Sequence, residues 1–246
     1  MGTNTGTATL AFDLREALRH LGERDAVLRD LIENAAAFAI DADNGQSPYD
    51  VLLEAIAYQS ISGKAAATIF GRIKALGEND CPPSPEQMLK LPAAKLRKAG
   101  LSGAKVMAMK DLAKKAVAGI VPTHSEALLL SDEELVERLV SVRGIGAWTV
   151  EMFLIFRLGR PDVLPIHDLG VKKGWSVAYG KKHMPKPQEL LTFGERWRPY
   201  RSVASWYMWR AFERAGYKVT NKIRPKPVRP KKRRGGKPAK PRKKSK

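Results

Sequence analysis

The residues of this chain whose types and spacing could do chemistry lie together in Leu139–Gly170. A Gly-Ile-Gly turn comes first, at Gly144–Gly146, and an isolated carboxylate, Asp168, stands near the end of the stretch. A fixed carboxylate can stabilise positive charge that develops on a reacting carbon, and it can orient an attacking water. These residues therefore suit a hydrolytic step beside an anionic group that the turn holds.

The glycine turn itself suits a phosphate. The two glycines, Gly144 and Gly146, let the backbone take positive φ values and approach a partner without a Cβ in the way. The next helix would begin at the turn, so its free N–H groups and positive dipole end would face an anion such as a DNA phosphate. An ordinary corner between two helices, with glycine at a C-cap, explains the turn equally well.

Helices must position both features. Ser131, with Glu134 three residues later, forms a capping-box pattern that predicts a helix beginning near Asp132. Asp168 suits the N-cap of a helix over Leu169–Ala178, and this role is compatible with a chemical one because a cap residue is held rigidly. Between the two, a helix is predicted from apolar residues at helical spacing, namely Val150, Phe153, Leu154 and Leu158.

The first half of the chain also shows helical patterns. Two helices are expected over Leu10–Leu21 and Asp25–Ala39, with a turn at Asp41–Gly45. Serine followed by proline predicts further helix starts at Ser47 and Ser84. Strand patterns are scarce, so the sequence predicts an all-α fold.

The last predicted helix follows Pro199-Tyr200-Arg201-Ser202. It carries apolar and aromatic residues on every side, so it should be largely buried. We assign its aromatic residues Tyr207, Trp209 and Phe212 to the core, because an aromatic stripe at helical spacing is more often core than pocket.

The wider stretch resembles the helix-hairpin-helix DNA glycosylases. Within them, the segments GIGAWTVEMFL and LGRPDVLPIHDLGVKKG are similar to the DNA-3-methyladenine glycosylase II branch, and the resemblance runs roughly over 50–216. It implies two helical subdomains around a cleft, with the hairpin (142–146) and Asp168 at its mouth. The helical domain would span 1–217, with 50–165 as its middle part and the N-terminal helices packed on the C-terminal ones.

The resemblance also implies roles for individual residues. Asp168 would be catalytic, and the base pocket would contain Trp148, Tyr200 and Tyr58. DNA would contact Gly144, Ile145, Gly146, Gln59, Ser60 and Arg201. Gln59 could equally be a polar residue at a helix end, and the small Ser60 leaves the identity of the intercalating wedge open. His167 could position water or be a surface residue.

Trp148 stands where the bifunctional members of the superfamily carry a lysine nucleophile, so no Schiff base is expected. The resemblance implies a monofunctional enzyme that removes 3-methyladenine and 7-methylguanine in base excision repair. Two alternatives are a non-catalytic helix-hairpin-helix DNA-binding protein and a glycosylase for oxidised or mismatched bases.

The cofactor expectations are modest. The single cysteine, Cys81, excludes a disulfide framework and the four-cysteine iron–sulfur cluster of some relatives. No metal is required by the side chains. As in relatives, the backbone carbonyls of Val140, Val142 and Ile145 would hold a structural monovalent cation.

Charge is concentrated at the C-terminus. Residues 218–246 hold 15 Lys and Arg and no acid, so the first 217 residues carry only +4 of the net charge of +19. This segment is rich in proline and lacks aromatics, which predicts a disordered arm that neutralises DNA phosphates, or else a solubilising or targeting tail.

The partner expected is double-stranded DNA with damaged bases. We expect an intracellular monomer with no membrane span, in the cytoplasm and nucleoid of a bacterium or the nucleus of a eukaryote.

Overall fold

The computed structural model describes residues 10, 12–40, 42 and 46–216. Within this part every regular element is helical, so the all-α prediction is confirmed. The basic segment 218–246 and most of the turn expected at 41–45 lie outside the described residues. The helices are α1 (Leu14–Arg24), α2 (Ala26–Asn34), α3 (Pro48–Tyr58), α4 (Gly63–Lys74), α5 (Pro85–Lys90), α6 (Ala93–Lys98), α7 (Gly103–Val117), α8 (His124–Leu129), α9 (Asp132–Val140), α10 (Ala147–Phe156), α11 (Leu169–Ala178), α12 (Pro187–Gly194) and α13 (Arg201–Arg214), with a short 3₁₀ turn, η1 (Glu195–Trp197).

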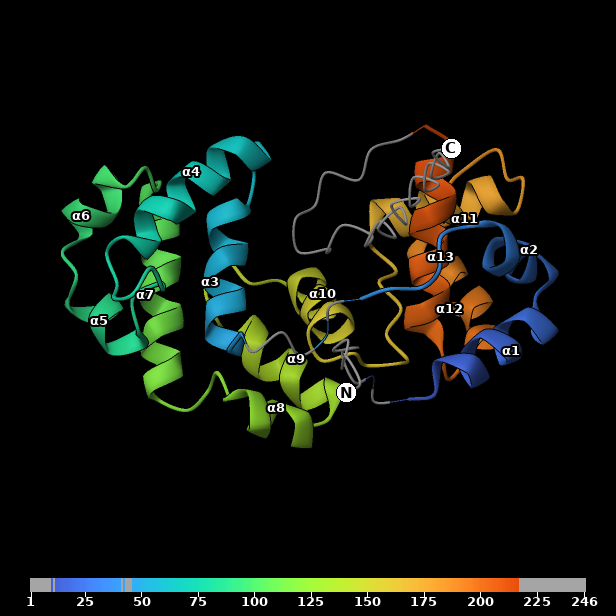
Figure 1. Cartoon of the computed structure of the whole chain (residues 1–246), viewed down its shortest axis with the longest axis horizontal. Coiled ribbons are helices and arrows are strands. Elements are labelled where there is room, and N and C mark those ends of the chain that lie inside the picture. The colour runs from blue at the N-terminus through green and yellow to red at the C-terminus, as the bar shows by residue number, and fades with distance from the viewer. Residues whose placement is uncertain (1–9, 11, 41, 43–45, 217–246) are drawn as a thin grey trace, which may run out of the picture.

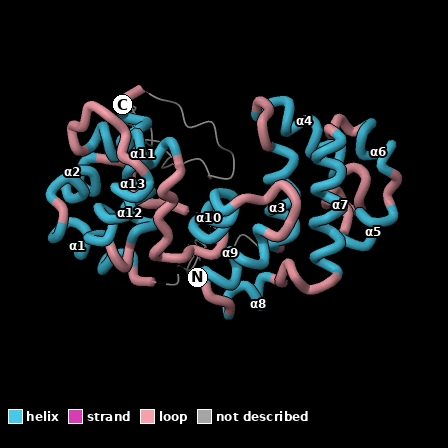
Figure 2. The backbone as a smooth tube through the Cα atoms, turned by 180° about the vertical axis from the view of Figure 1, so that it is seen from behind, coloured by secondary structure: helices cyan, strands magenta, loops and turns pink. Residues whose placement is uncertain are grey.

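The helices form two groups with α9 and α10 between them (Figure 1). One group contains α3 to α7, and the other contains α1, α2 and α11 to α13. The view from behind shows the same separation (Figure 2). Since α10 lies at the centre, a side chain near its start can reach an element of either group.

The second group joins the two ends of the described chain. Helices α1 and α2 pack against α13 and η1. Asp25 is buried there, where it accepts hydrogen bonds from the Tyr179 hydroxyl at 2.5 Å and the Trp197 indole N–H at 3.1 Å. The Trp206 indole donates to the carbonyl of Ala39 at 3.1 Å.

Aspartate caps fix the first two helices at bounds that differ from the predicted ones. Asp13 accepts the N–H of Arg15 at 2.8 Å, so α1 begins four residues later than its apolar pattern indicates. Asp25 is the C-cap of α1 and also the N-cap of α2, where it accepts the N–H of Val27 at 3.0 Å. Helix α2 ends at Asn34, short of the predicted Ala39, because the pattern counted apolar residues of the following extended segment.

Helices α11 and α13 cross at near backbone contact. A Cβ on Gly174 of α11 would overlap the main-chain carbonyl of Met208 in α13. No residue larger than glycine fits between the two helices at this point. The crossing therefore sets how the start of α11 lies against α13.

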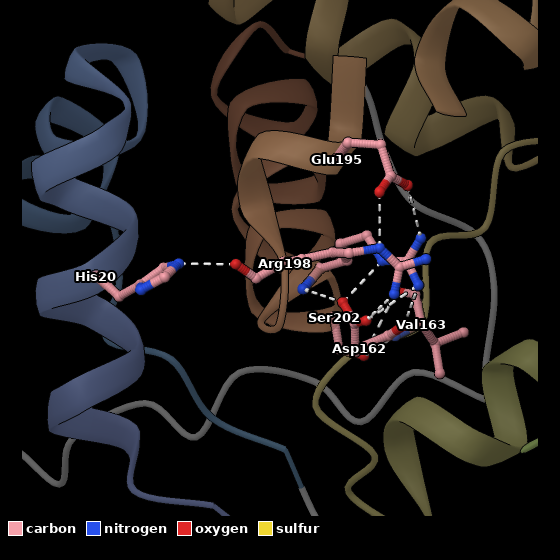
Figure 3. A network of polar contacts seen from close by, with 7 residues as sticks. His20, Asp162, Val163, Glu195, Arg198 and Ser202 are labelled. Carbon is pink, nitrogen blue, oxygen red and sulfur yellow. Dashed lines mark hydrogen bonds and ion pairs between the residues drawn. The ribbon is translucent and has the colours of Figure 1, made fainter. Parts of the chain in front are cut away.

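The segment that leads to α11 is tied to the start of α13 by a polar network (Figure 3). Arg198 and Arg201 bind Asp162 at 2.6 and 2.7 Å, and the N–H of Val163 donates to the Ser202 hydroxyl at 2.9 Å. A hydrogen bond of 2.7 Å from His20 Nε2 to the carbonyl of Arg198 links this network to α1. The chain is thus fixed a few residues before Asp168.

No helix in the described part of the chain is long and apolar enough to cross a membrane.

Candidate active site

Asp168 is the N-cap of α11, as predicted. Its Oδ1 atom accepts the main-chain N–H of Val171 at 2.7 Å and the Trp209 indole N–H at 2.7 Å. Its Oδ2 atom accepts the Trp148 indole N–H at 2.9 Å. The residue is only 5% exposed. Three N–H donors from three helices therefore hold a buried carboxylate in one orientation.

Trp148 is the predicted pocket residue that the structure brings to Asp168. It lies in the first turn of α10, directly after the glycine hairpin, and is partly buried. Its indole joins the hairpin element to the carboxylate, so the anion-binding end of α10 and the catalytic candidate form one unit.

Trp209 lies in the core, as its helical spacing predicts, and it also contacts the site. The ring is fully buried and stacks on Phe156 with 5.3 Å between centroids, but its N–H points to Asp168. A Cβ on Gly170 would lie 2.8 Å from Cδ1 of Trp209, so the fit around the indole is tight. A buried indole N–H usually requires an acceptor, which is the signal that the spacing argument overlooked.

The hairpin lies between α9 and α10, and its capping-box start at Ser131 is confirmed. Gly144 has a φ of +81°, as expected for a left-handed glycine. Gly146 is not left-handed, because its φ is −102°, and a Cβ there would meet no atom of the protein within 4 Å. The close approach of a DNA partner to these glycines stays a prediction. Gly146 is the N-cap of α10 and has no side chain to satisfy the first amides of the helix. These amides are available for an anion.

Two residues of α7 that sequence reasoning missed hold the hairpin. The Asp111 carboxylate accepts the N–H of Arg143 at 2.7 Å and the Lys115 ammonium at 2.9 Å, and Lys115 also donates to the carbonyl of Ser141. Burial opposes ionisation, but these two donors lower the pKa of Asp111 below its usual value. In the sequence, Asp111 and Lys115 form an ordinary i,i+4 pair on a helix, which does not indicate that they hold the hairpin.

Gln59 also contacts the hairpin. It is the C-cap of α3, and its side-chain amide donates to the carbonyl of Gly144 at 2.8 Å. The Lys105 ammonium donates to the carbonyls of Ala57 and Gln59 at 2.8 and 2.7 Å, and burial lowers its pKa. Ser60 is exposed with a φ of +57°. Gln59 thus has a structural role, and the DNA contacts of Gln59 and Ser60 stay predictions.

Arg201 has a role within the protein, and its predicted DNA contact stays a prediction. Its guanidinium is 11% exposed and binds Asp162 at 2.7 Å and Glu195 at 3.5 Å. These ion pairs join the start of α13 to the segment before α11 and to η1. Local sequence patterns do not show this pairing, because Asp162 lies 39 residues from Arg201.

Tyr200 and Tyr58 pack against other aromatic rings, and His167 directly precedes Asp168 in the chain. Tyr200 precedes α13, nine residues before Trp209, which is roughly 13 Å along a helix. Its ring packs on His20 and Phe12, at 5.2 and 5.9 Å between centroids, and its pocket role stays a prediction. Tyr58 packs edge-on against Phe70 at 6.2 Å, and its pocket role stays a prediction. His167 is exposed.

The hairpin carbonyls have the chemistry for a monovalent cation. In the described residues, no cluster of three or more His, Cys, Asp or Glu could hold a metal ion. Val140 ends α9, and the last carbonyls of a helix lie beyond the reach of its own amides. The carbonyl of Val142 accepts one hydrogen bond, from the N–H of Ile145 at 3.0 Å, and keeps a second lone pair.

Comparisons with known proteins agree on one family. The family model described as HhH-GPD superfamily base excision DNA repair protein matches residues 53–199. DNA-3-methyladenine glycosylase 1 of Schizosaccharomyces pombe is 39% identical over 187 residues, which cover 76% of this chain and 79% of that protein. The putative DNA-3-methyladenine glycosylase YfjP of Bacillus subtilis is 31% identical over 172 residues, which cover 68% of this chain and 60% of that protein.

Solved structures give the same result. The 3-methyladenine DNA glycosylase of Schizosaccharomyces pombe in complex with abasic DNA has a TM-score of 0.72 and 34% identity, covering 83% of this chain and all of that one. A DNA-3-methyladenine glycosidase from Bacillus halodurans has a TM-score of 0.74 and 30% identity, covering 81% of this chain and 90% of that one.

Proposed function

The chain belongs to the HhH-GPD superfamily of base excision DNA repair proteins, and from this premise we propose that it is a monofunctional DNA glycosylase that hydrolyses the N-glycosidic bond of alkylated purines. The observation that carries the proposal is the Asp168 carboxylate, buried and held by three N–H donors. Such a group is suited to stabilise the positive charge that the sugar acquires as the base leaves.

The proposed reaction begins with a damaged nucleotide turned out of the duplex, because C1′ is not accessible within the stack. The free amides at the start of α10 bind a backbone phosphate and bring the sugar toward Asp168. Trp148, between the hairpin and the carboxylate, offers its ring to the base. A base alkylated at N3 of adenine or N7 of guanine carries positive charge, and the electron pair of the broken bond neutralises it.

Base selection tests this proposal. We expect release of 3-methyladenine and 7-methylguanine from methylated DNA, and slow or no release of neutral 8-oxoguanine, because an aromatic ring attracts a cationic base more strongly than a neutral one. Trp148→Ala should lower release of the cationic bases more than release of neutral hypoxanthine. The measurement is single-turnover release of each base from otherwise identical duplexes. Efficient excision of 8-oxoguanine would contradict selection by charge.

A matched variant separates the two tasks of Trp148. Trp148→Phe keeps an aromatic face but loses the N–H that Asp168 accepts. If the ring selects the base, the Phe variant should slow all substrates by a similar factor and keep the preference for cationic ones. An equal preference in the Ala and Phe variants would show that the ring does not select.

The proposed monofunctional mechanism, in which Trp148 replaces a lysine nucleophile, can be tested separately. Borohydride added during turnover should trap no covalent adduct between the protein and DNA, because no amine takes the place of water as the nucleophile. Gel electrophoresis of the borohydride-treated reaction, beside a known bifunctional glycosylase, detects the adduct. A trapped species would show that another lysine attacks the sugar.

The two alternatives account for less of the site. A non-catalytic DNA-binding protein has use for the glycine hairpin and for the cap that Oδ1 of Asp168 supplies, but not for the contact of Oδ2 with Trp148. A glycosylase for oxidised bases would share this fold, and solved 8-oxoguanine glycosylases at 17% identity show the fold alone. The base-release experiment decides between all three.

Three further features complete the proposal. The carbonyls of Val140, Val142 and Ile145 are the ligands for a monovalent cation, which would add positive charge near the bound phosphate. The Lys- and Arg-rich residues 218–246 neutralise further phosphates. The protein acts as an intracellular monomer on duplex DNA.

A further inference from the structure

Glu151 is the one charged residue of α10, whose sequence is otherwise AWTVEMFLIF. It lies three residues after Trp148, and residues at this spacing share a helix face, so Glu151 lies on the side from which the indole reaches Asp168. Its Oε2 atom is buried and has no hydrogen-bond partner within the described residues. A buried carboxyl oxygen without a partner is uncommon and costly, which suggests a functional use.

The electrostatic surroundings of Glu151 are acidic. Burial raises the pKa of Glu151 to about 7, and the negative charge of Asp168 adds to the rise. Helix α9, which packs on α10, carries the charged residues Asp132, Glu133, Glu134, Glu137 and Arg138. Helix α11, which begins beside Trp148, adds Lys172 and Lys173. Of all these groups, Asp168 is the one that acts on Glu151.

We propose that Glu151 is a second catalytic carboxylate, which accepts a proton from the water that attacks C1′ of the flipped nucleotide. The proposal rests on the proposed glycosylase function. Asp168 is less suited to this step, because both of its oxygens already accept N–H donors. The two carboxylates thus have separate roles. Asp168 stabilises the sugar cation, and Glu151 removes a proton from the attacking water.

The step balances without another reactant. The bond between C1′ and the base nitrogen breaks, and its electron pair leaves with the base, which becomes neutral if it was cationic. The water oxygen forms a bond to C1′, and the released proton moves to the ionised Glu151. When the site opens, Glu151 releases this proton to the solvent. The products are the free base and an abasic sugar.

The pH dependence follows from this role. A base must be ionised, so single-turnover release of 7-methylguanine should rise about tenfold per pH unit below pH 7 and level off above it. Glu151→Gln should abolish the rise and lower the plateau by roughly 100-fold or more. Glu137→Gln, which removes an exposed charge from α9, should leave both unchanged.

Azide distinguishes a proton acceptor from a mere negative charge. Azide is an anionic nucleophile that needs no proton removed, so it should restore base release to Glu151→Gln and not to Asp168→Asn. A rate loss that azide does not restore, or a wild-type rate that falls as the pH rises through 7, would overturn the role of Glu151.

Melting curves and binding to abasic DNA show whether the variant is folded. The folded pKa of Glu151 lies above the ordinary value of 4.5, so its stabilising contribution is complete below pH 4.5 and is lost as the pH rises through 7. Glu151→Gln should therefore melt higher than the wild type at pH 8. If it does not fold, the wild-type pH profile alone decides. A wild type that releases no methylated base refutes the proposed function instead.

Discussion

Replacement of Asp168 by asparagine is expected to lower base release by at least roughly 100-fold, about 2.7 kcal/mol in activation free energy. The asparagine oxygen can keep the hydrogen bonds that Oδ1 accepts from Val171 and Trp209, so the cap of α11 remains. Its amide nitrogen then takes the place of Oδ2 and faces the Trp148 N–H, where two donors meet. The charge is lost and the Trp148 contact with it, while the fold stays intact.

Single-turnover base release measures this effect, with thermal melting and affinity for abasic DNA as the controls. Both control values should stay near those of the wild type, because the cap and the hairpin amides are unchanged. Asp168→Ala should also melt lower, since it removes the cap. Retention of more than a tenth of the wild-type rate by the asparagine variant would refute the catalytic assignment.

Gly174→Ala is expected to cause the largest loss of stability. The new Cβ would overlap the main-chain carbonyl of Met208, and a backbone atom cannot move aside as a side chain can. Helices α11 and α13 must separate, which we expect to cost at least about 3 kcal/mol. For a domain of this size the melting temperature should fall by roughly 6–12 °C.

Gly71→Ala is the matched control, because Gly71 is also a helical glycine and a Cβ there meets nothing within 4 Å. It should leave the melting temperature unchanged or raise it slightly. Separation of α11 from α13 should also move Asp168 away from the Trp209 N–H, so folded Gly174→Ala should lose activity as well. Equal melting temperatures for the two variants would contradict the close crossing.

Local signals were sufficient to predict much of this fold. The starts of α3, α5 and α9 follow from serine caps, and the bounds of α11 follow from Asp168 and the apolar pattern after it. A cap needs only a side-chain oxygen and an amide two or three residues away, and both are visible in the sequence. The cap role of Asp168 follows from the same local signal, whereas its predicted catalytic role rests on the chemistry of a carboxylate and on the family resemblance.

The parts that sequence reasoning missed depend on contacts between distant residues. Trp209 donates to a carboxylate 41 residues away, and Arg201 binds one 39 residues away. The pairing of Asp111 with the hairpin spans 32 residues. Helical spacing shows which residues are buried and not which polar atom each one meets. Glu151 did leave a local signal, as a single charge in an apolar helix.

The packing of α1 and α2 against α13 has a consequence for folding during synthesis on the ribosome. The hydrogen bonds from Tyr179, Trp197 and Trp206 to Asp25 and Ala39, which join the N-terminal helices to the C-terminal ones, connect residues 154 to 172 positions apart. On a ribosome that adds 5–20 residues per second, the first two helices would wait roughly 10–30 s for their partners. Their apolar faces stay exposed during that time, whereas α3 to α7 can assemble from neighbours in sequence. The nascent chain is therefore most exposed to aggregation and to chaperones at its first forty residues, until α13 emerges.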